Sequence, residues 1–281
     1  MYKRKIAGCT IVLAFAMCLC ACSNKATKLD NTIESVTEIP TVEAPTLGIP
    51  TTEVPTQSVP TIEVPSEDYT TGKINIGAYI TFGTYEQDND TYNGKEAIEW
   101  IVLDVKDGKA LVISRAAIDV QKYNEIEEET TWEECSLRKW LNDVFFNEAF
   151  SEEEKDRIPT VVVSADRNTT YHTYAGNSTE DKVFLLSMQE VDKYFPYNED
   201  RICEASGYVI DELALHVYET ISCSWWLRTQ GQFKDTSVVV LDNGTVYADG
   251  IDVVSSEGIA ILGYGGVRIG VRPALWIEID N

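Results

Sequence analysis

Prolines recur every five residues in the first quarter of the chain, and this repeat limits which part of the chain can fold. They occupy positions 40, 45, 50, 55, 60 and 65, which accounts for six of the nine prolines in the protein. Proline lacks a backbone N–H and breaks helices, so a folded repeat is not expected here. We predict that residues 22–72 form an extended, disordered tether rich in proline and threonine.

The first 22 residues have the pattern of an export signal. Three basic residues at positions 3–5 precede an apolar run over 6–21, which is too short to span a bilayer core about 30 Å thick. The segment Leu19-Cys20-Ala21-Cys22 resembles a bacterial lipobox, whose last cysteine receives the lipid. We expect residues 1–21 to be a lipoprotein signal peptide and Cys22 to anchor the chain to the extracellular face of the cell membrane. An ordinary signal peptide is the alternative.

The remaining residues, 73–281, suffice for one domain with a sizeable core. Their apolar pattern predicts strands, then helices, then strands again, without the alternation of strand and helix that marks a parallel sheet. We therefore predict a single compact α+β domain with a mixed or antiparallel sheet and two or three helices. The predicted strands cover 74–83, 98–103, 110–113, 182–186, 223–228, 238–241, 245–248 and 271–279, and the main predicted helices cover 137–145 and 188–195.

Several short signals mark where these elements begin and turn. Capping-box spacing, with Ser or Thr three residues before Glu, predicts helix starts at three places. The pairs are Thr131 with Glu134, Ser151 with Glu154, and Ser187 with Glu190, and Ser136 is a second candidate cap for the first helix. Asn243-Gly244, between two apolar runs, predicts a hairpin with a type I′ turn.

The chain is strongly acidic, with a formal net charge of −23 at pH 7. This charge repels nucleic acid and anionic membrane surfaces, so we expect no nucleic-acid partner. It suits a soluble secreted domain, and it could also attract cations or basic ligands.

Three of the seven cysteines, Cys135, Cys203 and Cys223, lie in the predicted domain. At most one disulfide can form among three cysteines, and the sequence leaves open whether two of them pair. None belongs to a CxxC motif and no histidine adjoins them, so a zinc site is not expected.

The polar segment 87–94 is a weak candidate for a metal site. Asp88, Asp90 and Asn93 offer the oxygen ligands that Ca²⁺ prefers. The segment departs from the EF-hand pattern, because Tyr92 stands at its fifth position and Asn93 stands where the turn glycine belongs. A plain hairpin loop is the alternative, and no other cofactor is expected.

Four residues are candidate ligand contacts. Trp225 and Trp226 point to opposite faces of a predicted strand, so one belongs to the core and the other could stack on a ligand. Arg228 follows on the same strand; the favoured alternative, which also applies to Arg272, is that it pairs with a buried carboxylate. Tyr171 lies in a polar loop that suits a binding surface. No catalytic residue can be selected, since no carboxylate pair stands out among so many.

Six phrases of the domain resemble a family of uncharacterised secreted proteins from Clostridia-like Firmicutes. They are Gly77–Tyr85, Ile98–Leu103, Leu137–Asn142, Lys182–Ser187, Trp225-Trp226-Leu227-Arg228 and Val271-Arg272-Pro273-Ala274-Leu275-Trp276. The chain departs from that family at Thr229-Gln230, where the family commonly has Ser-Pro.

More distantly, the Trp-Trp-Leu-Arg and Val-Arg-Pro strands resemble the formylglycine-generating-enzyme branch of the C-type-lectin fold. The resemblance implies a compact α+β domain whose termini meet in one sheet. Those enzymes use a cysteine pair near the C-terminal end, and Cys223 is the only cysteine after Cys203. Oxidase chemistry is therefore not expected.

The sequence thus predicts a surface-anchored lipoprotein with a non-enzymatic, lectin-like domain. Its ligand would be a glycan, a cell-wall fragment or a surface protein. A cell-envelope hydrolase that uses an acidic pair is the alternative, and a transporter's solute-binding lipoprotein is disfavoured because the strand–helix alternation is missing. Neither the ligand nor the oligomeric state follows from the sequence.

Overall fold

The computed structural model describes residues 74–215, 220–254 and 269–279. The predicted signal peptide, the lipid site Cys22 and the tether lie outside the described residues. Within the described ranges, no helix is both long enough and apolar enough to cross a membrane. These ranges form a mixed α+β domain, as predicted from the sequence, but with three separate sheets instead of one and with more helical segments than the two or three predicted.

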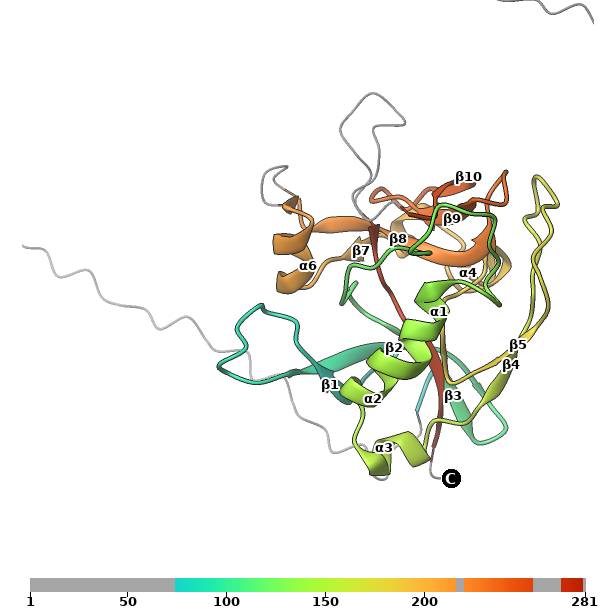
Figure 1. The fold of residues 1–281 in the computed structure, drawn as a ribbon. Helices are drawn as coiled ribbons and strands as arrows, with labels where there is room; N and C mark the ends of the chain where they lie inside the picture. Colours follow the sequence, from blue (N-terminus) through green and yellow to red (C-terminus); the bar gives the residue numbers. More distant parts are fainter. Residues whose placement is uncertain (1–73, 216–219, 255–268, 280–281) are drawn as a thin grey trace, which may run out of the picture. The chain divides into compact units, whose positions relative to one another are not determined.

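The first sheet brings the beginning and the end of the domain together (Figure 1). Its strand order is β1-β2-β3-β12-β6, and all neighbouring strands are antiparallel. The strands are β1 (Tyr79–Tyr85), β2 (Glu96–Lys106), β3 (Lys109–Ser114), β6 (Val183–Phe184) and β12 (Ala274–Glu278). The last strand of the chain therefore lies inside the sheet, between β3 and β6.

The second sheet is built around one long buried strand, β8. Its order is β10-β9-β8-β11, and β7 also pairs with β8. The strands are β7 (Cys203–Glu204), β8 (Ser222–Gln230), β9 (Thr236–Val240), β10 (Val246–Asp252) and β11 (Ile269–Gly270). Only β11 runs parallel to β8. A separate two-stranded sheet pairs β4 (Val161–Val163) with β5 (Thr179–Asp181).

Short helices connect and cover these sheets (Figure 1). They are α1 (Ser136–Trp140), the π-helical η1 (Leu141–Phe145), α2 (Phe146–Ala149), α3 (Glu152–Asp156), α4 (Met188–Tyr194), α5 (Asn198–Arg201) and α6 (Gly207–Glu212). Phe145 and Phe150 pack on Tyr85 and Phe82 of β1, with ring centroids 5.2 and 5.4 Å apart respectively. This aromatic contact fixes the helical segment against the first sheet.

The predicted helix over 137–145 differs from the structure in its start and in its winding. Cys135 is the N-cap, and its sulfur accepts a hydrogen bond from the Arg138 N–H at 3.4 Å, so the predicted Thr131 capping box is wrong. The π-helical turn changes the direction in which its side chains point, so the apolar face expected for a regular α-helix is not kept. Val144, expected in the core, is consequently 42% exposed.

The other two capping boxes are confirmed. Ser151 and Ser187 each accept a hydrogen bond from the backbone N–H of a glutamate three residues on, and that glutamate bonds back to the cap.

The Asn243-Gly244 turn differs from the prediction. Gly244 has φ +82°, but Asn243 is not among the described residues with positive φ, and a type I′ turn needs both. The Gly244 N–H donates to the Leu241 carbonyl at 2.8 Å, so the hairpin has a type I turn followed by a left-handed glycine.

Two glycines near β1 test how strongly local packing restricts the backbone. Gly83 has φ +73°, and a Cβ there would lie 2.6 Å from the Phe150 ring and 2.7 Å from the Ala149 carbonyl oxygen. Gly77 has φ +84°, with nothing within 4 Å of a Cβ.

We predict that Gly77→Ala lowers the free energy of unfolding by about 1–2 kcal/mol, the cost of a left-handed alanine. Gly83→Ala adds a clash with the ring and the carbonyl, and should cost about 2–5 kcal/mol. Urea unfolding followed by tryptophan fluorescence measures both values. Equal costs for the two variants would contradict this account of Gly83.

Candidate functional site

The predicted tryptophan contacts lie in the core. Trp225 and Trp226 are both 0% exposed. Their indole N–H groups donate to the backbone carbonyls of Arg201 at 3.1 Å and Gln121 at 3.0 Å. The expectation that one ring of the pair faces outward is therefore not met, because β8 is covered on both faces. Neither ring can serve as an exposed platform for a ligand.

Arg228 is also buried, with a side chain only 2% exposed. Its guanidinium forms ion pairs with Glu190 and, at 3.1 Å, with Asp166, and it donates to the Leu185 carbonyl at 2.8 Å. These partners satisfy the charge inside the protein, as the alternative reading from the sequence expected. Arg228 joins α4 to β8 and faces no described hollow.

Tyr171 is the one predicted ligand contact that lies on the surface. Its side chain borders an open hollow of about 630 Å³, together with Tyr174 and Phe233. The three residues are 36%, 53% and 61% exposed, respectively. We call this feature the aromatic hollow; its other lining residues are Glu129, Thr173, Gln232, Lys234 and Asp235.

A buried asparagine holds the tyrosine loop in place. Asn168 is 0% exposed, and its side-chain N–H group donates to the carbonyls of Gln230 at 2.9 Å and Ala248 at 2.8 Å. Its side-chain oxygen accepts from the backbone N–H groups of Thr170 and Tyr171 at 2.9 and 3.1 Å. One side chain thus attaches the loop to β8 and β10 before the loop reaches the hollow.

Hydrogen bonds also orient the polar groups of the aromatic hollow. The Tyr171 hydroxyl donates to Asp249 Oδ1 at 2.7 Å, which raises the pKa of the tyrosine and keeps its hydroxyl protonated. Thr173 Oγ1 donates to the Gly231 carbonyl at 2.6 Å. Lys234 pairs with Glu129 at 2.9 Å. The hollow therefore combines exposed rings with a polar rim that is already ordered.

Sequence reasoning missed Phe233, and it covered Tyr174 only as part of the loop over 171–177 without naming it as a contact. Tyr174 lies three residues after Tyr171 in the same polar loop, which is a signal that could have been used. Phe233 stands between polar neighbours just after β8, where a core residue is not expected. Its closeness to the tyrosines depends on contacts between distant parts of the chain, which periodicity does not reveal.

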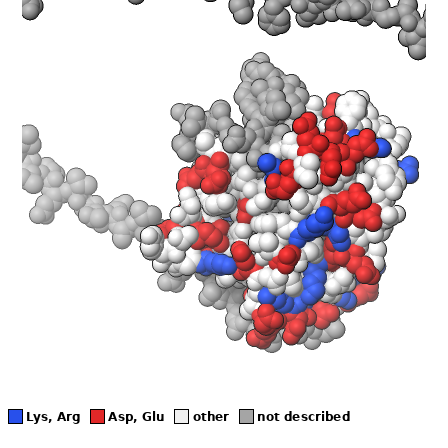
Figure 2. Space-filling model, viewed as in Figure 1, with Lys and Arg blue, Asp and Glu red and all other residues white. Residues whose placement is uncertain are grey.

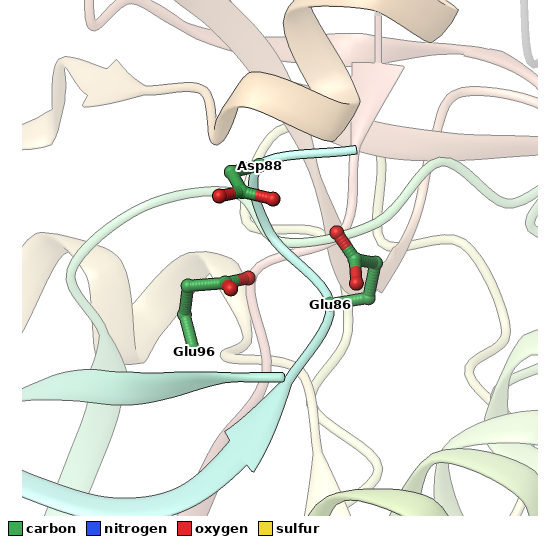
Figure 3. Close-up of side chains that lie close together, drawn as sticks. All are labelled: Glu86, Asp88 and Glu96. Atoms are coloured by element: carbon green, nitrogen blue, oxygen red, sulfur yellow. The ribbon is translucent and has the colours of Figure 1, made fainter. Parts of the chain in front are cut away.

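The predicted metal ligands only partly coincide with the group that could hold a cation. Glu86, Asp88 and Glu96 place carboxylate oxygens within 4.8 Å of one another, between the end of β1 and the start of β2 (Figure 3). Asp90 and Asn93 are not in this group. Asp90 Oδ1 accepts from the Tyr92 N–H at 3.1 Å, and the Asn93 amide donates to Asp88 Oδ2 at 2.7 Å. These bonds stabilise the loop itself, and hydrogen bonding from Asn93 lowers the pKa of Asp88.

Glu96 also borders a second, smaller hollow of about 320 Å³. Its lining includes Glu99, Arg115, Glu204 and Ser206. Arg115 pairs with Glu99 at 2.7 Å, so its charge is already compensated. Without exposed aromatic rings, this hollow offers fewer contacts to an organic ligand than the aromatic hollow does.

One carboxyl group is buried without a basic partner among the described residues. Asp119 is 4% exposed; it accepts hydrogen bonds from the Tyr85 hydroxyl, from the Val120 N–H at 2.6 Å and from the Gln121 amide at 3.0 Å. Burial raises the pKa of Asp119, and these hydrogen bonds offset the effect only in part. The folded protein therefore holds this proton more tightly than the unfolded chain does.

We predict that Asp119→Asn flattens the dependence of stability on pH. With a raised folded pKa, the aspartate favours folding below its ordinary pKa near 4, and that contribution is lost as the pH rises through the folded value. The variant should gain stability relative to the wild type as the pH rises above about 4 in urea unfolding. Tyr85→Phe removes a hydrogen-bond donor to the Asp119 carboxylate, so it should raise the pKa of Asp119 further and increase the loss of stability with rising pH. Parallel plots of the free energy of unfolding against pH for wild type and Asp119→Asn would contradict the raised pKa of Asp119.

Comparisons with known proteins place the chain in one family. No curated protein and no solved structure matches it. The model of the domain of unknown function DUF6273 matches residues 107–279, which is more than half of the chain. This match includes every lining residue of the aromatic hollow, whereas Glu86, Asp88 and Glu96 precede it. The chain therefore belongs to the DUF6273 family.

Proposed function

We propose that this protein is a surface-anchored lipoprotein whose domain is a non-enzymatic, lectin-like binding module for a neutral glycan. The observation that carries the proposal is the aromatic hollow, where Tyr171, Tyr174 and Phe233 stay exposed around one open space. The volume of about 630 Å³ falls in the range of small-molecule sites.

The chemistry of the hollow favours a sugar. Exposed aromatic rings beside a polar rim suit a ligand that has an apolar face and hydroxyl groups at its edge. Thr173, Gln232 and Asp235 supply donors and acceptors for such hydroxyls. Sugar rings present both kinds of surface, and a short oligosaccharide can cover more than one aromatic ring.

The charge around the hollow disfavours an anionic ligand. Its single lysine, Lys234, is paired with Glu129, and Asp235 adds a further negative charge. Acidic side chains also predominate on the face of the domain shown in Figure 2. A neutral oligosaccharide, free or within a cell-wall fragment, therefore fits this surface better than a charged polymer does.

Two parts of the proposal rest on the sequence. The lipobox-like segment ending at Cys22 supports an anchor on the extracellular face of the membrane. The resemblance to the C-type-lectin fold supports the lectin-like assignment. The shared sheet of β1 and β12 is consistent with that resemblance, which implies termini that meet in one sheet.

The test is binding of the full chain to an array of neutral oligosaccharides and peptidoglycan fragments, followed by calorimetry on any hit. We predict that Tyr174→Ala and Phe233→Ala each weaken the affinity about 2- to 13-fold, since an aromatic contact contributes about 0.5–1.5 kcal/mol. Tyr92→Ala is the matched control, because Tyr92 is fully exposed and lies outside the hollow.

Three outcomes would count against the proposal. Binding that survives both substitutions would place the ligand elsewhere. Cleavage of the bound oligosaccharide would favour the alternative function, a cell-envelope hydrolase. The absence of any glycan binding by folded protein would leave a surface protein as the expected ligand.

A further inference from the structure

Cys203 and Cys223 are direct neighbours across two strands. Cys203 of β7 is the register partner of Cys223 of β8 in an antiparallel pair. Side chains at such positions lie on the same face of the sheet, with Cβ atoms about 4.5–5.5 Å apart. The Cα separation of paired residues, about 4.5–5.5 Å, lies within the 4.4–6.8 Å found for disulfides, whereas closure must bring the Cβ atoms to about 3.5–4.5 Å.

The two thiols are enclosed by the core. Cys203 is 0% exposed and Cys223 is 1% exposed, and the Cys203 thiol donates to the Glu204 carbonyl at 3.3 Å. Gly270 of β11 leaves room for them, because a Cβ at that position would lie 3.1 Å from Cys223 Sγ and 2.7 Å from the Ala117 Cβ. Strand β11 therefore leaves space for the two sulfurs because Gly270 has no side chain.

A buried arginine without a carboxylate partner lies beside this pair. Arg272 is 2% exposed; it donates to the carbonyls of Ser114 at 2.8 Å and Arg115 at 3.4 Å, and its Nη1 has no hydrogen-bond partner. Its guanidinium also lies 4.9 Å from the centre of the Trp225 ring. Among the described residues no carboxylate pairs with Arg272. A buried cation of this kind calls for a nearby negative charge.

Among the described residues, the neighbouring Cys203 can supply such a charge as a thiolate. Burial opposes ionisation of Cys203, but the Cys223 thiol and the positive charge of Arg272 outweigh it and lower the pKa of Cys203 to about 7. The neighbouring Cys203 and burial raise the pKa of Cys223 well above its usual value, so this thiol keeps its proton. The third cysteine, Cys135, differs: burial raises its pKa to about 12.

We propose that Cys203 and Cys223 form a redox-active dithiol that closes to a cross-strand disulfide, with Arg272 stabilising the Cys203 thiolate in the reduced state. Cys135 stays a free thiol. This inference does not depend on the glycan-binding proposal.

The oxidant is a disulfide compound, either a small molecule or a protein. The Cys203 thiolate attacks one sulfur of that compound, which forms a mixed disulfide and releases one thiol equivalent. Cys223 then loses its proton to solvent and attacks the Cys203 sulfur, which forms the protein disulfide and releases the second. Two protein thiols are oxidised and one disulfide compound is reduced. Because both sulfurs are buried, closure belongs to folding or to a transient opening of β7.

The test is refolding of the reduced full chain in buffers of reduced and oxidised glutathione. Acid quenching, alkylation and mass spectrometry then report each cysteine, and cleavage after Glu204 separates Cys203 from Cys223. We expect these two residues to be cross-linked at high oxidised glutathione, while Cys135 is alkylated. Disulfide reduction should lower Tm by roughly 5–10 °C. Cys203→Ser and Cys223→Ser should abolish that shift, and the control Cys135→Ser should retain it.

Arg272 gives a second, independent readout. Arg272→Met removes the charge that stabilises the thiolate, so the glutathione ratio at half-oxidation should shift at least about tenfold in favour of the disulfide. Arg272→Lys keeps a positive charge and should shift the ratio less, and it serves as the fallback if the methionine variant does not fold. Alkylation of Cys203 at every ratio, or a disulfide that includes Cys135, would overturn the proposal. An unchanged ratio in both Arg272 variants would overturn the role of the arginine.

Discussion

The burial of strand β8 is the constraint on which the rest of the domain depends. Eight of its nine residues are buried, with β9 along one edge and β7 and β11 along the other. Polar side chains on the strand then need partners inside the protein, and most of them find one, although Gln230 Oε1 has none. Arg228 pairs with carboxylates on neighbouring elements, the Thr229 hydroxyl accepts from the Met188 N–H at 2.9 Å, and the Gln230 amide donates to the Thr130 carbonyl. These bonds attach α4 and the loops to the second sheet.

The aromatic hollow is positioned by the same strand. Asn168 bonds to the carbonyl of Gln230 at the end of β8, and the loop with Tyr171 and Tyr174 starts from that fixed point. Phe233 follows β8 directly, before β9 begins. Exposed rings at the end of a rigid strand lose little freedom when a ligand binds, which favours binding by a preformed surface.

Local signals predicted the local structure well. The strand over 98–103 and the caps Ser151 and Ser187 were confirmed, because each depends on residues that are close in the sequence, whereas the strand predicted over 74–83 begins only at Tyr79. Two features of the structure were not predicted, and the reason is the same for both. The sulfur cap of Cys135 and the burial of both Trp225 and Trp226 depend on what packs against those residues. The candidate site shows the same limit. Tyr171 could be named from its loop, but the hollow requires Phe233, which is 62 positions away in the chain.

The place of β12 has a consequence for how the protein is made. Because β12 lies between β3 and β6, the first sheet stays divided until the final residues of the chain have arrived. A ribosome or an export channel that delivers the chain from its N-terminus would release nearly all of it before this sheet can close. Such late, long-range pairing slows folding.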